Sequence, residues 1–411
     1  TNRSGRQAII ATVIIDATER ALMAELAGAR SAPFPAGMHT FRRTVIGGEP
    51  RPFPGGSVRR VDPPLWFSGV CYPVYEYTLQ LPLESPTWAA VMAVEQKARD
   101  LTFHPDQQFA SDVLFWVPPD PLTCEASDQR PWSGVSALPL GVFRLRGIPA
   151  LFVLGGRVDI PRESAARLLR PLALIDAGTR VGRAAAEMAA TLPKPDRPGL
   201  PGDTTATSDK LDTREMLAGP RPFLNWPRIA AEQRMLPILG RWDVVVVGGG
   251  TSGAPAAIGA ARQGASTLVL EYLYGMGGVS TLGAITQYCH GYRGGFTAEV
   301  PGGASWRVEE RAEWWRETAR AAGAELWFGV LGSGAVMEGD RVRGVIVTTP
   351  AGRGVVLANT VIDATGNADI AAAAGAACVT TDGTDIAIQG TGLPPRNLGA
   401  TYTNTDFTMS D

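Results

Sequence analysis

Residues 242–271 read WDVVVVGGGTSGAPAAIGAARQGASTLVLE, and this stretch decides the fold. The apolar run after Asp243 is typical of a buried parallel strand, the glycines form G-x-G-x-x-G, and an alanine-rich helix and a second apolar strand follow. Gly248 permits a tight turn, Gly250 leaves room beside a diphosphate, and Gly253 lets the helix pack closely on the strand. The first helical turn presents free N–H groups and the positive end of the helix dipole to phosphates. This order predicts a strand–turn–helix–strand unit that binds a dinucleotide.

Glu271 ends the second strand of this unit, 18 residues after Gly253. A carboxylate at that strand tip is expected to accept hydrogen bonds from an adenosine ribose. The same negative charge disfavours a ribose 2′-phosphate, so NADP is disfavoured as the ligand. The alternative is a structural turn of the same shape with an empty site.

Composition narrows the possible partners of the chain. Its 411 residues are 45% hydrophobic, and 38 basic side chains nearly balance 40 acidic ones, which argues against nucleic acid or an anionic membrane as the main partner. The 4 cysteines are scattered without a C-x-x-C pair and there are 3 histidines, so a zinc site, a poly-histidine metal centre and a disulfide scaffold are all disfavoured. No apolar run reaches transmembrane length. The sequence therefore predicts a small-molecule substrate, no metal, no nucleic acid and no membrane.

An internal repeat divides the chain. Residues 5–29 (GRQAIIATVIIDATERALMAELAGA) and 352–376 (GRGVVLANTVIDATGNADIAAAAGA) align at an offset of 347, which pairs Asp16 with Asp363. Each copy reads as an apolar strand, a turn after D-A-T and an alanine-rich helix. Many α/β strands converge on such a pattern, but the shared G-R start and A-G-A end favour a duplication of two large modules.

The region between the copies has three parts. Residues 40–140 mix strand-like and helix-like patterns and suit a mixed α+β substrate-side domain. Residues 147–190 combine a short strand (LFVL), a G-G-R turn and a long helix with small residues. Residues 193–240 begin with a stretch rich in Pro, Gly, Thr and Asp, which predicts a linker and a domain boundary.

In the glycine motif and the segments that follow it, the chain resembles the FAD-dependent oxidoreductases of the glutathione-reductase-like superfamily. The resemblance rests on GGGTSG (248–253), Glu271, GMGGVSTLG (275–283) and VIDATGNADIAAAAGA (361–376). The hairpin-like turns near residues 338–340 and 351–352 also suit a two-domain flavoprotein better than an NAD dehydrogenase. The resemblance implies FAD as the cofactor and an α/β fold, with a Rossmann-like FAD-binding domain of parallel sheet and β-meander. It implies further contacts near the FAD at Gly277, Gly278, Thr281, Thr365, Gly366 and Asp369.

The order of the segments differs from that family. Residues 147–190 are similar to the family's C-terminal segment, whose G-R turn (Gly156, Arg157) lies against the flavin, yet here they precede the glycine motif. We therefore expect residues 1–192 to be the back half of a first flavoprotein-like module and 241–411 the front half of a second. The remainder of the parent polypeptide, or a second chain, would then complete the site. The alternative is a circular permutation or complementation in trans. A chain that opens on polar residues and enters a strand at once is also expected to be a fragment or a processed piece that lacks its targeting region, and a cytoplasmic location is slightly favoured.

The two copies of the repeat differ at one telling position: the first has Glu19 where the second has Gly366. A carboxylate there would crowd and repel a diphosphate, so the first module is expected to be degenerate or to bind flavin differently, unless Glu19 points to solvent.

The candidates for chemistry follow the flavin-side loop. His290 is the candidate general acid or base, because its unperturbed pKa is near neutrality, and Arg293 is a candidate for an anionic substrate group. Each has the alternative of an ordinary surface or structural residue. A covalent flavin link through His290 or Cys289 is a further option. Arg157 would stabilise an anionic reduced flavin. The sequence thus predicts hydride transfer from a small organic substrate to FAD. The alternatives are a non-catalytic flavoprotein-like scaffold and an NAD-dependent dehydrogenase.

Overall fold

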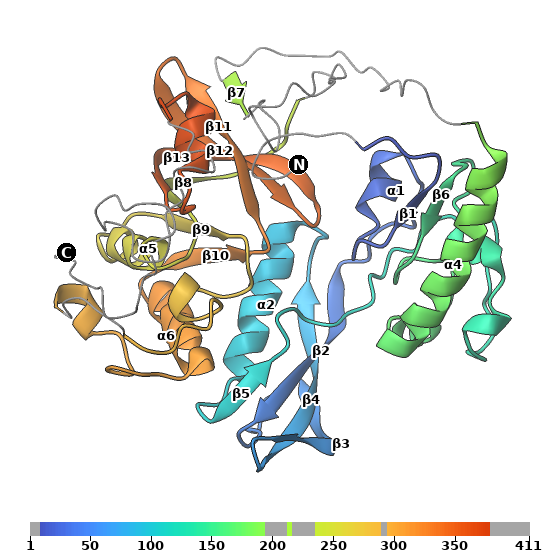
Figure 1. Cartoon of the computed structure of the whole chain (residues 1–411), viewed down its shortest axis with the longest axis horizontal. Coiled ribbons are helices and arrows are strands. Elements are labelled where there is room, and N and C mark those ends of the chain that lie inside the picture. Colours follow the sequence, from blue (N-terminus) through green and yellow to red (C-terminus); the bar gives the residue numbers. More distant parts are fainter. Residues whose placement is uncertain (1–8, 194–211, 216–234, 289–293, 379–411) are drawn as a thin grey trace, which may run out of the picture.

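The largest sheet in the described part of the chain has seven strands. The computed structural model describes residues 9–193, 212–215, 235–288 and 294–378. The strand order is β10-β9-β8-β13-β12-β11-β7 (Figure 1). The first four strands pair in parallel: β10 (Ala324–Phe328), β9 (Thr267–Glu271), β8 (Ile238–Val247) and β13 (Gly352–Asp363). The others are antiparallel: β12 (Arg341–Thr349), β11 (Leu331–Glu338) and β7 (Asp212–Arg214). The predicted parallel sheet with a β-meander is confirmed.

The parallel part of the sheet is a buried core. Val245, Val246 and Val247 of β8 are buried, as expected for a parallel strand covered on both faces. The described residues of this half include the helices α5 (Gly253–Arg262), α6 (Val308–Ala321) and α7 (Asp369–Ala374). Helix α5 follows β8 directly and leads back to β9, so the predicted strand–turn–helix–strand unit is present.

A second, antiparallel sheet lies in the region that the sequence predicts as the substrate-side domain. Its order is β3-β4-β2-β5, with β3 (Gly56–Phe67), β4 (Val70–Leu83), β2 (Gly37–Gly47) and β5 (Gln107–Ala110). Helix α2 (Trp88–Thr102) lies against it (Figure 1). Phe41 of β2 and Leu79 of β4 form the core of this sheet with Ala98 of α2. The mixed α+β character predicted for this region is confirmed.

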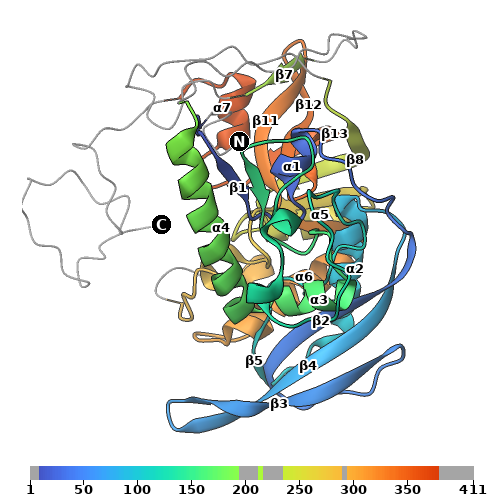
Figure 2. The ribbon, with the colours of Figure 1, turned by 90° about the vertical axis from the view of Figure 1, so that its right-hand side faces the viewer.

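The third unit is built around a two-stranded parallel sheet. Strand β1 (Ile14–Asp16) pairs with β6 (Leu151–Val153), and α1 (Leu22–Leu26), α3 (Arg162–Leu168) and α4 (Pro171–Thr191) accompany them (Figure 2). Two short 3₁₀ segments, η1 (Val135–Ala137) and η2 (Leu140–Phe143), complete the unit. Its core joins Phe152 of β6 to Ala177 and Val181 of α4.

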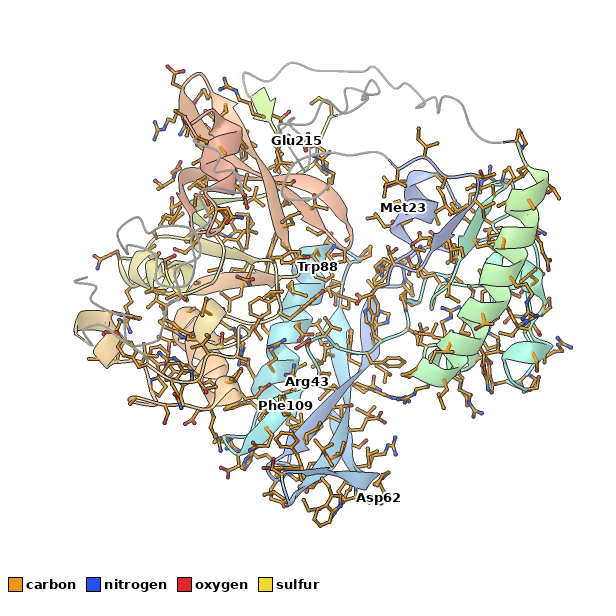
Figure 3. All side chains as sticks on the ribbon, in the orientation of Figure 1. Met23, Arg43, Asp62, Trp88, Phe109 and Glu215 are labelled. Atoms are coloured by element: carbon orange, nitrogen blue, oxygen red, sulfur yellow. The ribbon has the colours of Figure 1, made fainter. Side chains whose placement is uncertain are left out.

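Helix α2 joins the first half of the chain to the second. Trp88 and Met92 at its beginning lie in the hydrophobic core of the seven-stranded sheet, whereas Val94 and Ala98 lie in the core of the four-stranded sheet. Figure 3 labels Trp88 at the end of α2 that meets the seven-stranded sheet. The two sheets therefore share one helix, although their strands are far apart in sequence.

Strand β7 lies inside the segment 193–240 that the sequence predicts as a linker. It pairs with β11 at the edge of the seven-stranded sheet, with Thr213 opposite Val336. Its three residues read D-T-R and show no apolar periodicity, so the sequence does not indicate a strand here. An edge strand of this kind is held mainly by its backbone hydrogen bonds to the neighbouring strand. Strand β8 also begins within that segment, at Ile238.

Candidate dinucleotide-binding site

Three loops meet at the carboxyl ends of the parallel strands. The Gly277 N–H donates to the carbonyl of Gly249 over 2.9 Å, which ties the second glycine loop to the first. A Cβ on Gly278 would lie 2.9 Å from the Cα of Gly250, so these two backbones touch. The third loop, which follows β13, lies against Gly248. This edge of an open α/β sheet is where such folds bind their ligands.

The glycines of the first loop meet steric demands that side chains would violate. Gly248 has φ +97°, and a Cβ there would lie 2.4 Å from the Ala364 carbonyl oxygen. A Cβ on Gly253 would lie 1.8 Å from the carbonyl oxygen of Gly248. Gly250 is different, because its nearest neighbour would be the Gly278 Cα at 3.9 Å. The first and last glycines therefore close the turn, and the middle one leaves open space.

The start of α5 offers hydrogen-bond donors at this open space. Within the described part of the chain, the N–H groups of Gly250 and Thr251 have no hydrogen-bond partner, and they directly precede α5. Unpaired N–H groups at a helix N-terminus attract phosphate, through both the hydrogen bonds and the helix dipole. These groups fit the diphosphate of a dinucleotide.

Glu271 closes the other side of the first loop from the tip of β9. Its Oε2 accepts the N–H of Gly249 at 2.6 Å, and its Oε1 accepts the N–H of Leu273 at 2.7 Å. Burial raises the pKa of this carboxyl, while the backbone N–H donors act in the opposite direction. Each oxygen uses one acceptor position for these bonds, so both keep capacity for a ribose hydroxyl.

The second glycine loop is held by its own side chains. The Thr281 hydroxyl, which is fully buried, donates to the Met276 carbonyl over 2.6 Å, and the Trp306 indole donates to the Ser280 carbonyl over 2.7 Å. Gly277 adopts φ +96°, where a Cβ would lie 2.7 Å from Trp315. Thr281, directly after the short 3₁₀ segment η3 (Gly278–Ser280), therefore ties the end of this segment back to Met276 before it.

The D-A-T-G loop after β13 is organised by Asp363. Its Oδ1 accepts the Thr365 hydroxyl at 2.7 Å, and the Thr365 hydroxyl oxygen accepts the N–H of Asp369 at 3.0 Å. Gly366 has φ +82°, and a Cβ there would meet nothing within 4 Å. Asp369 is the first residue of α7. These bonds fix the shape of the loop at residues 364–369, and Ala364 at its start touches the first glycine loop.

Glu19, which stands at the Gly366 position of the first copy, lies near acidic and phenolic groups. Glu19 is exposed at the surface, but desolvation by the neighbouring protein and the charge of Glu95 on α2 both raise its pKa. Burial, together with the charges of Glu19, Glu95 and Asp112, raises the pKa of Tyr274 to about 12. Tyr274 belongs to the loop after Glu271, so Glu19 lies near enough to α2 and to this loop for its charge to act there.

Arg157 is one of the most buried side chains, and its donors are occupied. Its guanidinium donates to the Asp120 carboxylate at 3.0 Å, to the Asp120 and Arg20 carbonyls at 3.0 and 2.7 Å, and to the Glu25 carboxylate. Gly156 precedes it, where a Cβ would lie 3.0 Å from Leu169. Arg20, Glu25 and Asp120 also line a cavity of about 370 Å³ that Ala351 of the β12–β13 turn reaches from the second half. Arg157 thus anchors the wall of this cavity.

The predicted chemical residues His290 and Arg293, together with Cys289, lie outside the described residues. The described ranges contain no group of three or more His, Cys, Asp or Glu side chains that could hold a metal ion. In the same ranges, no helix has the length and apolar character needed to cross a membrane.

A charged interface between the two halves is not apparent in the sequence. Arg316 of α6 donates to Glu313 on its own helix, and across the interface to Gln96 at 3.0 Å and Asp100 at 2.9 Å on α2. Burial alone would lower the pKa of Arg316, but the hydrogen bonds and charges of Glu313 and Asp100 raise it overall. Nearby, Gln107 donates to Glu309 over 2.9 Å. The only sequence signal is the i, i+3 pair of Glu313 and Arg316, which is also common on solvated helices.

The second half matches a known family. Residues 243–401 match the family described as FAD dependent oxidoreductase, and this match supports FAD as the cofactor and a flavin oxidoreductase as the class of protein. No curated protein sequence matches the chain.

Three solved structures show partial likeness. A geranylgeranyl bacteriochlorophyll reductase-like protein from Thermoplasma acidophilum is 24% identical over 33% of this chain and 42% of its own, with a TM-score of 0.25. THI4 from Thermovibrio ammonificans is 26% identical over 32% of this chain and 61% of its own, with a TM-score of 0.26. L-proline dehydrogenase from P. horikoshii is 17% identical over 34% of this chain and 57% of its own, with a TM-score of 0.27. The chain thus spans less than two thirds of each.

Proposed function

We propose that the protein is an FAD-dependent oxidoreductase that takes a hydride from a small organic substrate. The observation that carries this proposal is the convergence of the two glycine loops and the D-A-T-G loop at one sheet edge, beside Glu271. The family match at residues 243–401 covers all of these elements and supports FAD over NAD. Within that class, the motifs at residues 248–253, 275–283 and 361–376, together with Glu271, favour membership of the glutathione-reductase-like superfamily.

The residues present fit the cofactor. The N–H groups of Gly250 and Thr251 would hold the diphosphate, and the two oxygens of Glu271 would accept the hydroxyl groups of the adenosine ribose. Gly277 and Gly278 would follow the cofactor toward its flavin end. The D-A-T-G loop, with Thr365, Gly366 and Asp369, would lie beside it.

FAD supplies the hydride acceptor when it is bound, so the protein's own tasks are to bind, orient and exchange protons. We assign the proton transfer to His290, whose ordinary pKa near neutrality suits either direction. Arg293 would hold an anionic group of the substrate. Arg157 is buried and paired with Asp120 and Glu25, so its part would be to hold the wall of the cavity in the first half.

We further propose that the chain consists of two half modules. Residues 1–192 would be the back half of a first module, residues 193–240 a connection, and residues 241–411 the front half of a second. The site would then be completed by a further protein segment. The shared hydrogen bonding of the two D-A-T segments, at a constant offset of 347, supports this organisation.

The test is a visible absorption spectrum of the purified full chain after addition of FAD and removal of the excess. A flavin spectrum with about one FAD released per chain on denaturation supports the proposal, and bleaching by a substrate identifies the oxidisable class. If FAD fails to bind while NAD binds, the chain is an NAD-dependent dehydrogenase. If neither binds, it is a scaffold. Flavin that stays with the denatured chain would direct peptide mapping to His290 and Cys289.

A further inference from the structure

The two D-A-T segments have the same local structure at an offset of 347. In the first, the Thr18 hydroxyl donates to Asp16 over 2.6 Å and accepts the N–H of Leu22 at 2.8 Å. In the second, the Thr365 hydroxyl makes the corresponding bonds to Asp363 and Asp369, at 2.7 and 3.0 Å. The residues before the two helices, Ala21 and Ala368, are both left-handed, with φ of 52° and 56°. Strands β1 and β13 are therefore equivalent, residue by residue, where they enter these loops.

The backbone of each strand shows which edge its neighbour occupies. On β1, the N–H of Ile14 donates to Ala150 over 2.9 Å, and the carbonyl of Asp16 accepts from Leu154 at 2.8 Å, so residues 14 and 16 face β6. On β13, the N–H of Ala364 donates to Val247 of β8 over 2.8 Å. Because peptide groups of successive residues in a strand point to opposite edges, residues 362 and 364 face β8, and residues 361 and 363 face away from it.

When the two copies of the repeat are aligned, the edge of β1 that pairs with β6 corresponds to the edge of β13 that does not pair with β8. Ile14 and Asp16, which bond β6, are equivalent to Val361 and Asp363, which face away from β8. In superposition, β6 and β8 would therefore flank one D-A-T strand on its two sides. Each copy has only one of these neighbours: within the described residues, no strand pairs with β13 at residues 361–363 on the side away from β8.

Side-chain burial agrees with a missing neighbour. Strands of parallel sheets are ordinarily buried on both faces. Ile14 and Ile15 of β1 are 44% and 40% exposed, whereas Val245 and Val246 of β8, which has a strand on each side, are fully buried. On β13, the two residues before the open edge, Asn359 and Thr360, are exposed. An open edge of this kind is a template for another strand.

We infer that residues 361–363 of β13 are the docking edge for a parallel strand of the β6 kind. The partner is a protein segment with the order of residues 151–191: a short apolar strand, a G-G-R turn and a long helix. The chain's own β6 is already paired with β1, so the segment is a further one. The β1–β6 register predicts the pairing: Val361 opposite the Leu151 position, Ile362 opposite Phe152 and Asp363 opposite Val153.

The test adds a synthetic polypeptide of residues 147–192 to the full chain and measures amide hydrogen exchange at single residues. In the chain alone, the amides of Val361 and Asp363 should exchange fast. With the polypeptide, both should exchange at least about tenfold more slowly, because they enter a ladder. The amides of Ile362 and Ala364 already face β8, so their slow exchange is the internal control. The measurement involves no flavin and is independent of the proposed activity.

A variant polypeptide distinguishes strand pairing from general association. Leu154→Pro removes the N–H that would donate to the Asp363 carbonyl, so it should abolish the slowing, whereas Arg183→Gln on the exposed side of the helix should preserve it. Three results would overturn the inference. The amides of Val361 and Asp363 are already protected in the chain alone, or the polypeptide leaves them unchanged, or it alters only Ile14 and Asp16, which would mean that it replaces the chain's own β6.

Discussion

At the scale of single residues, the glycines of the first loop are needed for two different reasons: one avoids a clash within the protein, and another leaves room for a ligand. Gly253 needs to lack a side chain because its Cβ would overlap the Gly248 carbonyl, whereas Gly250 needs only to leave space for a ligand. The N–H groups that face this space come from Gly250 and Thr251, and Thr251 is a position where the motif accepts any residue. Its role therefore comes from the backbone and could not be predicted from its side chain.

We predict that Gly253→Ala and Gly259→Ala have opposite effects, although both residues lie in α5. A Cβ at Gly253 would lie 1.8 Å from the Gly248 carbonyl oxygen, so the first substitution should cost about 2 kcal/mol or more. A Cβ at Gly259 meets nothing within 4 Å, and alanine in a helix interior should stabilise by about 0.5–1 kcal/mol. Thermal unfolding of the two variants measures both effects. Equal melting temperatures would contradict this description of the turn.

Glu271→Gln should weaken FAD binding by about 10- to 100-fold, because hydrogen bonds to a charged acceptor contribute about 1.5–3 kcal/mol. The amide keeps one acceptor oxygen, so the bond from either Gly249 or Leu273 can remain and the loop should stay folded. Titration of FAD by fluorescence quenching measures the change. Glu299→Gln, which removes an exposed partner of Arg262, is the matched control and should leave affinity unchanged. Unchanged affinity in Glu271→Gln would remove this residue from the site.

The cysteines should differ sharply in reactivity. Cys124 is buried, and burial raises its pKa to about 11, so at pH 8 only about one molecule in a thousand carries the thiolate. Cys71 and Cys378 are exposed. Treatment of the native protein with N-ethylmaleimide, followed by peptide mass spectrometry, should show modification at Cys71 and Cys378 and none at Cys124. Unfolding the protein first should make Cys124 react as well; reaction of native Cys124 would mean that this core opens.

At the scale of elements, regular patterns were predictable and long-range contacts were not. The apolar and charged spacing of residues 305–323 predicts a helix, and α6 occupies Val308–Ala321. The pattern of residues 86–101 likewise predicts α2. Nothing in either helix indicates that the two meet, because Asp100 and Arg316 are 216 residues apart and their charges are equally suited to water. Strand β7 escaped prediction for a similar reason, since its partner β11 supplies the bonds that order it.

The α2–α6 interface offers a matched pair of substitutions, because Arg316 and Arg320 both contact Asp100. Arg316 is buried, so Arg316→Ala leaves the buried Glu313 unpaired and should cost about 3–5 kcal/mol. Arg320 is 34% exposed, and Arg320→Ala should cost less than about 1 kcal/mol. Chemical denaturation, followed by circular dichroism, compares the two. Similar losses would show that the interface is solvated rather than buried.

At the scale of the whole molecule, the sequence predicts two half modules, and in the structure the two halves of the chain are packed together. The repeat and the reversed order of segments were visible in the sequence because they depend on local patterns. Trp88 at the core of the seven-stranded sheet was not, because its spacing on α2 fits either sheet. The indole of Trp88 donates to the Phe328 carbonyl over 2.9 Å, which fixes α2 to β10. Helix α2 therefore holds the four-stranded sheet against the seven-stranded sheet of the other half.

This packing predicts that the two halves stay associated when the chain is cut. A specific protease site placed between residues 196 and 206 would separate the first half, with α2, from the second half, with β10 and α6. The contacts of Trp88 with Phe328 and of Arg316 with Asp100 should keep the fragments together on size-exclusion chromatography. Trp88→Ala removes a large buried side chain at a cost of about 3–5 kcal/mol, so combining it with Arg316→Ala should release the fragments, whereas Arg320→Ala should not. Separation of the unsubstituted fragments would instead mean that the covalent connection, and not the contacts of α2, keeps the two halves together.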